Sequence, residues 1–351
     1  MRSIKVAILG GRGMVGQWFI KMLEGHPMFK LTALTSGSRA GTRYSESVKW
    51  LLGSNVPGYS KDITLLDSNP KYVDADIVFS SLPSDIAGRI EAEFAREGFI
   101  VISKASYYRM EPDVPLIVPE VNFDHMALVE VQKRRRDWDG AIVTDPNCTT
   151  SILALPLKPL DDAFGLKKIV VTTMQSVSGA GYPGVPSYEI MDNIVPYIPG
   201  EEDKIRLELR KILSEVEEEL IRERRIDVVA SCTRVPVLDG HLGSVYIESE
   251  SNPDLEEVID ALRNFKGPPQ ELKLPSAPEQ PIVVRKEIDR PQPRLDRMAG
   301  SIPGMSVVVG RVRKVNSKCF SFFVLGHNLV RGAAGSAILL AELLVKEGYV
   351  R

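Results

Sequence analysis

Residues 4–16, IKVAILGGRGMVG, carry an apolar run directly into a glycine-rich loop and the start of a helix-like segment. Gly10, Gly13 and Gly16 have the spacing that lets a backbone turn tightly after a strand and approach a pyrophosphate closely. A helix that begins at such a loop presents free N–H groups and its positive dipole end to phosphates. The stretch therefore predicts a Rossmann-type α/β fold that binds a dinucleotide.

The rest of the first 147 residues repeats this alternation of short β-branched runs and helical segments. Such alternation is typical of βαβ units around a parallel sheet. Gly25 and Gly98 each follow a helical segment, where glycine commonly ends a helix. The expected strands are 4–10, 30–36, 77–82, 100–104 and 141–144, and the expected helices are 14–25 and 86–98.

The pattern changes after Cys148, where longer apolar runs follow one another more closely. They predict a second, α+β domain with a mostly antiparallel sheet. Its expected strands are 167–175, 226–235, 243–250, 305–315 and 319–327. Residues 201–225 predict one long amphipathic helix whose charges mostly face solvent. The apolar helix after residue 329 needs a large surface to cover, which the first domain offers. The expected domains are 1–147, completed by 329–351, and 148–328.

Composition excludes several classes of protein. Lysine and arginine number 44 against 46 acidic residues, so no net charge attracts nucleic acid or membranes. The three cysteines are odd in number and widely spaced, which argues against a disulfide framework. The four histidines lack metal-ligand spacing, so we expect no metal. No apolar window reaches the length of a membrane span and no signal peptide is evident, so we expect a cytoplasmic location.

The end of the second expected strand indicates which dinucleotide binds. NAD sites usually place an acidic residue there for the ribose 2′-hydroxyl, whereas residues 34–43, LTSGSRAGTR, contain none. Hydroxyl and guanidinium groups of Ser36, Ser38 and Arg39 suit a 2′-phosphate. This favours NADP over NAD, the alternative being a polar turn without a ligand.

Cys148 lies in DPNCTTS, residues 145–151, between a strand that ends at Thr144 and an expected helix. Most lone cysteines are buried apolar residues. At the first turn of a helix, however, the dipole and free N–H groups lower a thiol pKa and can hold an oxyanion. Asn147 is placed to orient the thiol. Because Pro156 and Pro159 interrupt the segment, only its first two turns are expected with certainty to be helical.

A nucleophilic cysteine beside a nicotinamide predicts aldehyde chemistry through a thiohemiacetal and a thioester. Such chemistry needs a base and a group that holds the substrate. In TRVPVLDGH, residues 233–241, Arg234 could hold a carboxylate and His241 has a suitable pKa for acid–base catalysis. Taken alone, this pair could equally be ordinary surface residues.

Eight segments, in collinear order between residue 4 and about residue 350, resemble the aspartate-β-semialdehyde dehydrogenase family, in its archaeal and fungal branch. They are GGRGMVGQ, FSSLPSD, YYRMEPDVPLIVPEVN, DPNCTTS, QSVSGAGYPG, GEEDK, TRVPVLDGH and HNLVRGAAG. The resemblance implies an NADP-dependent homodimer or homotetramer. Its reaction would be the reductive dephosphorylation of L-aspartyl-4-phosphate to L-aspartate-4-semialdehyde, a step toward lysine, threonine, methionine and isoleucine.

The resemblance also implies roles for individual residues. Cys148 would be the nucleophile and His241 the general acid/base, with Asn147 and Gln175 completing the catalytic set. Arg234 would bind the substrate α-carboxylate, Glu201 its α-amino group, and Arg109 and Lys204 the phosphate. The implied cofactor-binding residues are Gly10, Arg12, Gly13, Met14, Val15, Gly16, Ser36, Ser38, Arg39, Leu82, Pro83, Ser178, Gly179 and Asn328.

Two positions depart from the family pattern. Lys104, in SKA, stands where the family usually has asparagine, so it adds a cation or changes the phosphate contact. The SGSR stretch at 36–39 also differs from the usual pattern, which leaves the 2′-phosphate ligands open.

Four alternatives stay open. Malonyl-CoA reductase shares the scaffold but tends to lack the asparagine before the cysteine and the second threonine after it, both present here as Asn147 and Thr150. N-acetylglutamyl-phosphate reductase fits the later segments less well. A non-catalytic NADP-binding protein would be expected to lose the nucleophile or the base. A cysteine hydrolase would leave the glycine loop unexplained.

Overall fold

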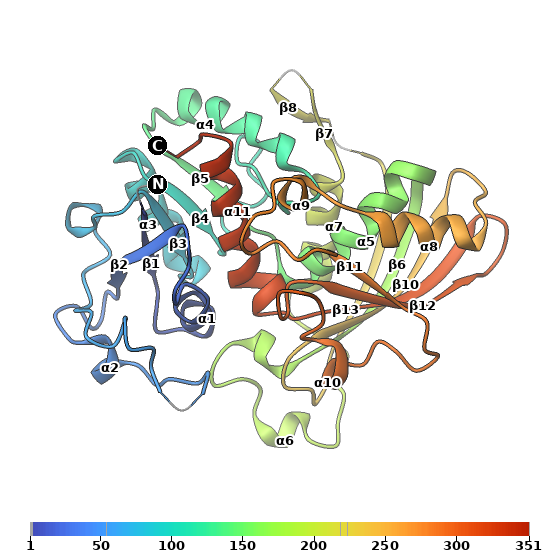
Figure 1. Ribbon diagram of the computed structural model, residues 1–351, viewed down its shortest axis with the longest axis horizontal. Coiled ribbons are helices and arrows are strands. Elements are labelled where there is room, and N and C mark those ends of the chain that lie inside the picture. Colours follow the sequence, from blue (N-terminus) through green and yellow to red (C-terminus); the bar gives the residue numbers. More distant parts are fainter. Residues whose placement is uncertain (1–2, 54, 218, 223, 351) are drawn as a thin grey trace.

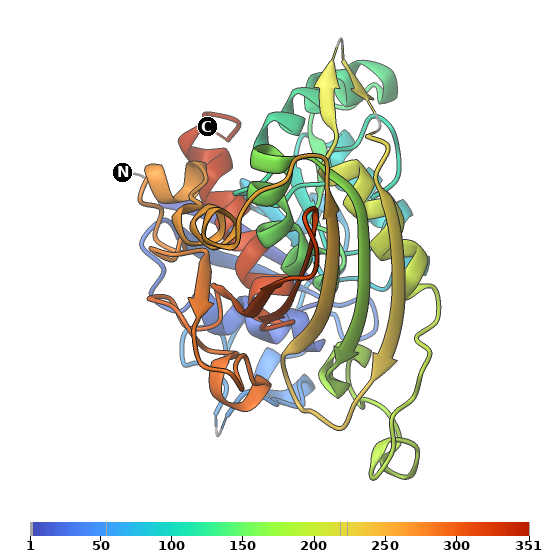
Figure 2. The ribbon, with the colours of Figure 1, turned by 90° about the vertical axis from the view of Figure 1, so that its right-hand side faces the viewer.

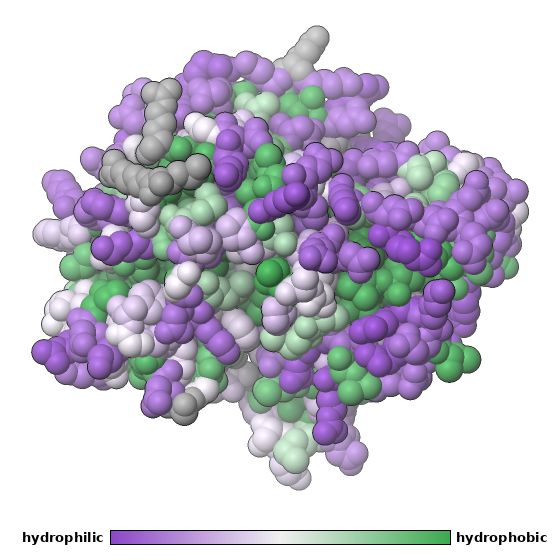
Figure 3. All heavy atoms as spheres, viewed as in Figure 1, coloured by the Kyte–Doolittle hydropathy of each residue, from purple (hydrophilic) through white to green (hydrophobic). Residues whose placement is uncertain are grey.

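The computed structural model describes residues 3–53, 55–217, 219–222 and 224–350. Two sheets lie side by side, each with its own helices, and the C-terminal helix lies between them (Figure 1). Among the described residues no helix is long and apolar enough to cross a membrane. Hydrophilic side chains predominate on the face seen in Figure 3, interrupted by small apolar areas.

The first sheet confirms the expected parallel architecture, with strand order β2-β1-β3-β4-β5. Its strands are short and nearly all buried, as expected when helices cover both faces. Because β2 and β3 lie on either side of β1, the order in which strands are added to the sheet reverses at β1. At such a point the carboxyl ends of the parallel strands, here β1 to β3, form a crevice in which a ligand can bind. The elements are β1 (Ile4–Leu9), α1 (Met14–Met22), β2 (Phe29–Thr35), α2 (Tyr44–Ser47), β3 (Ile77–Ser80), α3 (Ser84–Arg96), β4 (Ile100–Ser103), α4 (Leu128–Arg136) and β5 (Ala141–Thr144).

The C-terminal segment returns to this first sheet. A π-helical turn, η4 (Val330–Ala334), leads into α11 (Gly335–Lys346). Ala337, Ile338 and Leu340 are fully or almost fully buried in the same apolar cluster as α1 and strands β1 to β5. The apolar character of α11 on all sides is thereby explained, because it contacts both the first sheet and the second half of the chain.

The second sheet has the order β11-β12-β13-β10-β6-β9 and is mostly antiparallel, as expected, although it is a mixed sheet. Its three central pairings are antiparallel, but both edge strands pair in parallel, β9 with β6 and β11 with β12. Parallel pairing is possible because a connection that contains a helix joins the two strands of each edge pair. The strands are β6 (Leu166–Gln175), β9 (Asp227–Arg234), β10 (His241–Ser249), β11 (Ile282–Arg285), β12 (Val307–Lys314) and β13 (Cys319–Gly326).

Three helices cover one face of this sheet: α5 (Cys148–Phe164), α7 (Glu201–Ile212) and α8 (Leu255–Asn264). Among the described residues no helix lies over the opposite face, where β10, β6 and β9 face the viewer in Figure 2. Short helical turns complete the chain: η1 (Pro70–Tyr72), η2 (Phe123–Ala127), η3 (Val177–Ala180), α6 (Ser187–Ile190), α9 (Pro268–Glu271) and α10 (Pro293–Asp296).

The long helix expected over 201–225 is wrong. Helix α7 ends at Ile212, and the chain continues as a hairpin of β7 (Glu215–Glu217) and β8 (Leu220–Arg222); residues 218 and 223 lie outside the described part. Ser214 ends the helix because its hydroxyl donates to the Arg210 carbonyl (2.6 Å) and accepts the Arg224 N–H (2.9 Å). The charges of α7 do not all face solvent either, since Glu201, Glu208 and Lys211 are buried.

Helix α5 runs through both prolines without ending, further than the two turns expected. Each proline removes one backbone hydrogen bond from the helix. Burial of α5 against the second sheet, α7, α8 and η4 supplies the packing that offsets this loss. The helix therefore holds its first residue, Cys148, at a fixed point where the two halves of the molecule meet.

Candidate active site

Cys148 and His241 come together at the centre of the molecule. Cys148 is the first residue of α5, and His241 is the first residue of β10. The Cys148 Sγ and His241 Nε2 atoms lie 3.2 Å apart. Asn147 caps α5, because its side-chain oxygen accepts the N–H groups of Thr149 (2.9 Å) and Thr150 (3.3 Å). The Asn147 side chain thus orients the helix start, without itself contacting the thiol.

The backbone of Ser176 sets the tautomer of His241. The Ser176 N–H donates to His241 Nδ1 over 3.1 Å. A neutral ring therefore carries its proton on Nε2, the nitrogen that faces the Cys148 sulfur. Burial, with the positive charge of Arg234, lowers the pKa of His241 to about 3. At neutral pH the ring is consequently an uncharged hydrogen-bond donor to the sulfur.

The thiol pKa differs from the expectation drawn from the helix start. Burial and the nearby Glu201 carboxylate raise the pKa of Cys148 to about 11, although Lys104, a hydrogen bond with Thr149 and Arg109 act in the opposite direction. Desolvation of the thiolate thus outweighs the favourable placement at the helix N-terminus. The prediction that this placement lowers the thiol pKa is therefore wrong for the unliganded site.

Glu201 connects the expected catalytic residues to one another. Its carboxylate accepts both the Asn147 Nδ2 group and the Gln175 Nε2 group over 3.0 Å. Glu201 is the first residue of α7 and is only 6% exposed. These partners are neutral, so no cation of the described residues is bonded to the carboxylate, which is suited to bind one from a ligand.

The three expected substrate-binding cations differ in their surroundings. Arg234, at the end of β9, is buried and donates through Nη1 to the Ser176 carbonyl (2.8 Å). Arg109 is buried and donates to Glu208 Oε1 (2.9 Å) and to the Lys104 carbonyl (2.6 Å). Lys204, on the first turn of α7, is half-buried, and its ammonium bonds to none of the described residues.

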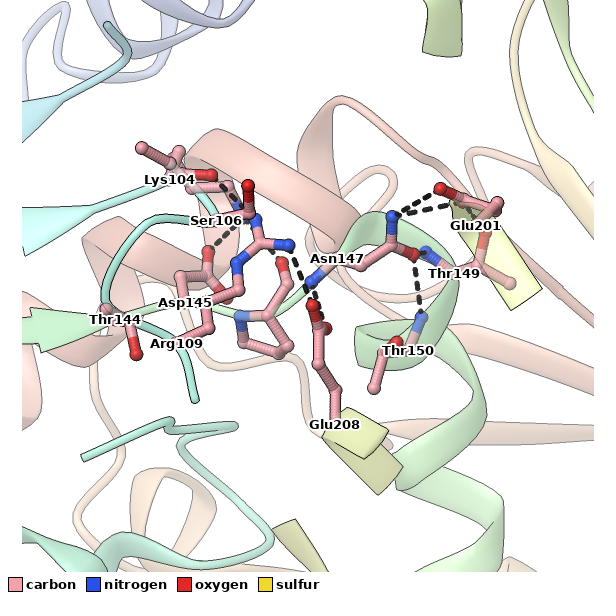
Figure 4. A network of polar contacts seen from close by, with 12 residues as sticks. Lys104, Ser106, Arg109, Thr144, Asp145, Asn147, Thr149, Thr150, Glu201 and Glu208 are labelled. Carbon is pink, nitrogen blue, oxygen red and sulfur yellow. Dashed lines mark hydrogen bonds and ion pairs between the residues drawn. The ribbon is translucent and has the colours of Figure 1, made fainter. Parts of the chain in front are cut away.

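Lys104 does not add a free cation to the site. Its side chain is buried, and Nζ donates to Asp145 Oδ2 (2.5 Å), the Pro146 carbonyl (3.3 Å) and the Gly332 carbonyl (3.1 Å). These three partners use all its N–H groups. Lys104 therefore ties the loop before Cys148 to η4. Figure 4 shows Lys104 near Arg109, to the left of the Asn147 cap.

The segment after β6 packs tightly against the thiol–imidazole pair. A Cβ atom at Gly179 would lie 2.8 Å from Arg234 Nη1 and 2.9 Å from His241 Cε1, so a larger residue would displace one of these side chains. Asn328 is buried and holds this segment, because Nδ2 donates to Ser178 Oγ (2.9 Å) and Oδ1 accepts the Gly240 N–H (2.9 Å). Asn328 thus supports the walls of the site through Ser178 and Gly240.

The glycine loop has the geometry of a phosphate cradle. Gly10 has φ +78°, and a Cβ atom at Gly16 would lie 2.5 Å from the Gly10 carbonyl oxygen. Met14 and Val15 form the first turn of α1, and no described side chain caps its free N–H groups. The Arg12 side chain lies beside them and donates through Nε to the Ser47 carbonyl (2.9 Å).

The remaining expected cofactor residues lie at the same edge of the first sheet. Ser36, Ser38 and Arg39 form the turn after β2, and Ser38 and Arg39 are exposed. Leu82 and Pro83 follow β3, with Pro83 directly before α3. A cavity of about 260 Å³ extends from this edge toward the second half of the chain, lined by Met14, Trp18, Leu51, Leu52, Val177, Ser178, Gly181, Tyr182, Pro183, Gly184, Leu238 and Asp239.

Sequence reasoning missed two residues of the site. Glu208, assigned to a solvent-facing helix, is 2% exposed and bonds to both Arg109 and the Asn147 N–H. Its helical spacing of seven from Glu201 was the available signal, because the two share a face. Ser176 orients His241 through its backbone N–H (3.1 Å) and its hydroxyl (3.2 Å), both at Nδ1, and no motif in the sequence marked it. Among the described residues, no group of histidines, cysteines and acids is arranged to hold a metal ion.

Known proteins resemble the chain over nearly its whole length. A profile of the semialdehyde dehydrogenase NAD-binding domain matches residues 5–129, and one of the semialdehyde dehydrogenase dimerisation domain matches residues 157–331. Aspartate-semialdehyde dehydrogenase of Archaeoglobus fulgidus is 54% identical over 98% of this chain and 99% of its own. Malonyl CoA reductase (NADP) of Metallosphaera sedula is 44% identical over 99% of both chains.

A solved structure agrees with this result. The crystal structure of aspartate semialdehyde dehydrogenase with NADP from Candida albicans superposes with a TM-score of 0.91 at 40% identity, covering 99% of this chain and all of that one. The same family is indicated by both profiles, by the archaeal and fungal relatives and by the superposed fold. The chain belongs to the aspartate-semialdehyde dehydrogenase family, in its archaeal and fungal branch.

Proposed function

We propose that this protein is an NADP-dependent aspartate-semialdehyde dehydrogenase that converts L-aspartyl-4-phosphate to L-aspartate-4-semialdehyde and phosphate. The reaction belongs to the biosynthesis of lysine, threonine, methionine and isoleucine. The observation that carries the proposal is the Cys148–His241 pair, 3.2 Å apart, inside a ring of charged groups suited to a phosphorylated amino acid.

The first sheet fits NADP. A Cβ atom at Gly10 or Gly16 would lie only 2.9 Å or 2.5 Å from a backbone carbonyl oxygen, and the uncapped N-terminus of α1 supports pyrophosphate binding there. Arg12 lies beside this helix start, and Ser36, Ser38 and Arg39 supply groups for the 2′-phosphate, whereas no acidic residue occurs between 34 and 43. Leu82, Pro83, Ser178, Gly179 and Asn328 would complete the cofactor site. When bound, NADPH supplies the hydride that reduces the acyl group.

Cys148 is the proposed nucleophile. Its sulfur attacks the acyl carbon while the thiol proton passes to a phosphate oxygen. The bond from the acyl carbon to the phosphate oxygen breaks, and the group leaves as hydrogen phosphate with the bonding electrons, which gives a thioester. His241 donates its Nε2 proton toward sulfur or the developing oxyanion, since Ser176 holds the ring in the tautomer that allows this donation. The backbone N–H of Cys148 itself, which precedes the N–H groups bound by the Asn147 cap, would be a further donor to an oxyanion.

The surrounding charges match the two ends of the substrate. Arg234 would bind the α-carboxylate, and Arg109 and Lys204 the phosphate. Glu201 would bind the α-ammonium group, while Gln175 and Asn147 hold the Glu201 carboxylate in place. The ammonium group distinguishes this substrate from malonyl-CoA, because a malonyl group would leave the buried Glu201 carboxylate without a cation.

A paired assay tests the proposal. Purified protein should reduce NADP when given aspartate semialdehyde and phosphate, and should oxidise NADPH little with malonyl-CoA, both followed by absorbance of the reduced nicotinamide. Cys148→Ala should abolish turnover while NADP binding, followed by fluorescence, stays near the wild-type value. Preferential turnover of malonyl-CoA would overturn the assignment in favour of the CoA-dependent relative.

We also propose the setting in which the enzyme works. The match of residues 157–331 to a dimerisation domain supports a homo-oligomer, built as a dimer or as a pair of dimers. We place the dimer contact on the uncovered face of the second sheet. Three free cysteines support a reducing, cytoplasmic location. Residues 1–147 with 329–351 form the proposed cofactor domain, and 148–328 the proposed catalytic domain.

A further inference from the structure

Glu208 joins two parts of the active site that come from distant segments of the chain. Its Oε1 atom accepts from Arg109 Nη1 (2.9 Å), and its Oε2 atom accepts the backbone N–H of Asn147 (2.7 Å). Figure 4 shows the carboxylate between these two partners. Glu208 is 2% exposed, so water does not compete for either bond.

The two partners have different tasks in the proposed reaction. Arg109 belongs to the proposed phosphate site, on a loop that leaves the first sheet. Asn147 immediately precedes the nucleophile at the start of α5. One carboxylate therefore fixes a phosphate-binding cation and the backbone at Cys148 relative to each other. This matters because catalytic groups misplaced by a fraction of a bond length lose much of their effect.

Helix α7 also holds the loop that carries Arg109 at a second point. Lys211 Nζ donates to the backbone carbonyls of Arg109 (2.7 Å), Glu111 (2.7 Å) and Val114 (2.8 Å). Lys211 thus places the loop, whereas Glu208 places the guanidinium group itself. The Arg109 Nε atom is buried and has no partner among the described residues, so the guanidinium keeps donor capacity beyond its two bonds.

We infer that Glu208 is a positioning residue. It holds the Arg109 guanidinium group and the Asn147 backbone at the relative positions that Cys148 needs to attack an acyl phosphate. The inference rests on the proposed function for the identity of the phosphate site. Glu208 itself touches neither phosphate nor the reacting carbon. Its effect on phosphate binding is therefore transmitted through Arg109.

Phosphate protection of Cys148 tests the inference without requiring turnover. Inorganic phosphate bound at Arg109 should slow alkylation of Cys148 by iodoacetamide in the NADP-loaded enzyme. In Glu208→Gln, the amide cannot accept from both partners, so the phosphate concentration that halves alkylation should rise about tenfold or more, as for loss of a hydrogen bond to a charged group. NADP affinity should not change.

Glu202→Gln is the matched control. Glu202 lies on the same helix, and its carboxylate also accepts one backbone N–H, that of Cys232 (3.0 Å), away from Arg109. This variant should leave phosphate protection at the wild-type value. Glu208→Asp, which keeps the charge but is too short to span both partners, provides a second test should Glu208→Gln fail to fold.

A double-mutant cycle separates positioning from a general structural role. If Glu208 acts through Arg109, Glu208→Gln should change phosphate protection less than about twofold in an Arg109→Gln background. The inference would be overturned if Glu208→Gln left phosphate protection unchanged, or if the effects of the two substitutions on protection simply multiplied. It would also be overturned if phosphate did not protect Cys148 in the wild-type enzyme. Turnover of malonyl-CoA alone would overturn the proposed function but not this readout.

Discussion

At the scale of single residues, Cys148 shows how far local sequence and three-dimensional surroundings can disagree. The helix start favours a thiolate, but burial beside Glu201 raises the thiol pKa to about 11. The Ser176 backbone N–H donates to Nδ1 of His241, so the neutral ring carries its proton on Nε2. Because burial lowers the pKa of His241, the ring is not an imidazolium at neutral pH. The resting site therefore holds a neutral thiol.

This state predicts the pH dependence of Cys148 alkylation in the unliganded protein. Because only the thiolate reacts and the pKa lies well above neutrality, the rate constant with iodoacetamide should rise about tenfold per pH unit from pH 7 to 9. Mass spectrometry of the peptide that contains Cys148 separates this signal from the two buried cysteines. A rate that levels off near neutral pH would contradict the raised pKa.

At the scale of elements, the π-helical turn η4 joins the C-terminal helix to the catalytic helix. Arg331 in this turn forms a fully buried, bidentate pair with Glu120, through Nη1–Oε1 (2.8 Å) and Nη2–Oε2 (2.5 Å). The next residue, Gly332, lies so close to Cys148 that a Cβ atom would approach the Cys148 Cβ to 2.7 Å. The pair thus anchors the turn against which the nucleophile packs.

Removal of one member of this pair should destabilise the protein strongly. Glu120→Ala leaves the Arg331 charge buried without a partner, and the free energy of unfolding should fall by about 3–5 kcal/mol. The double variant Glu120→Leu, Arg331→Met should lose less, because no uncompensated charge remains. Denaturant unfolding followed by circular dichroism measures both. A loss in Glu120→Ala comparable with that of an exposed substitution would show that the pair is not needed for stability.

At the scale of the whole molecule, one face of the second sheet is turned away from the helices α5, α7 and α8 that cover its other face. Helices bury its other face, whereas Val229 on β9 is 45% exposed. Phe323 on β13, partly exposed beneath the Arg311 guanidinium, adds an aromatic surface. Exposed apolar groups on a sheet face are typical of a contact between subunits.

A charge on this face should therefore change the oligomeric state. Val229→Arg would place a guanidinium in the proposed dimer contact, and light scattering after size-exclusion chromatography should show dissociation to monomers. Tyr72→Arg, at an exposed position in η1 beside the first sheet, is the matched control and should leave the mass unchanged. An unchanged mass for Val229→Arg would move the contact to another surface.

Local sequence by itself determined the first half of the fold and the position of the nucleophile. The strand, glycine loop and helix of residues 4–22 follow from short-range periodicity and backbone sterics, which act within a few residues. The strand that ends at Thr144 likewise placed Cys148 at a helix start. The alternation of apolar runs predicted the parallel sheet, and the apolar character of the last helix predicted that it covers the first domain.

Tertiary structure alone decided the properties that depend on neighbours far along the chain. Ser214 ended α7 through a bond to Arg224, and the parallel edges of the second sheet arose from crossovers that no local pattern marks. Glu208, expected to be an exposed charge, is buried and accepts hydrogen bonds from Arg109 and from the Asn147 backbone. Burial also raises the pKa of Cys148. Desolvation and long-range hydrogen bonds act only after the chain has folded, so these features could not be derived from the sequence.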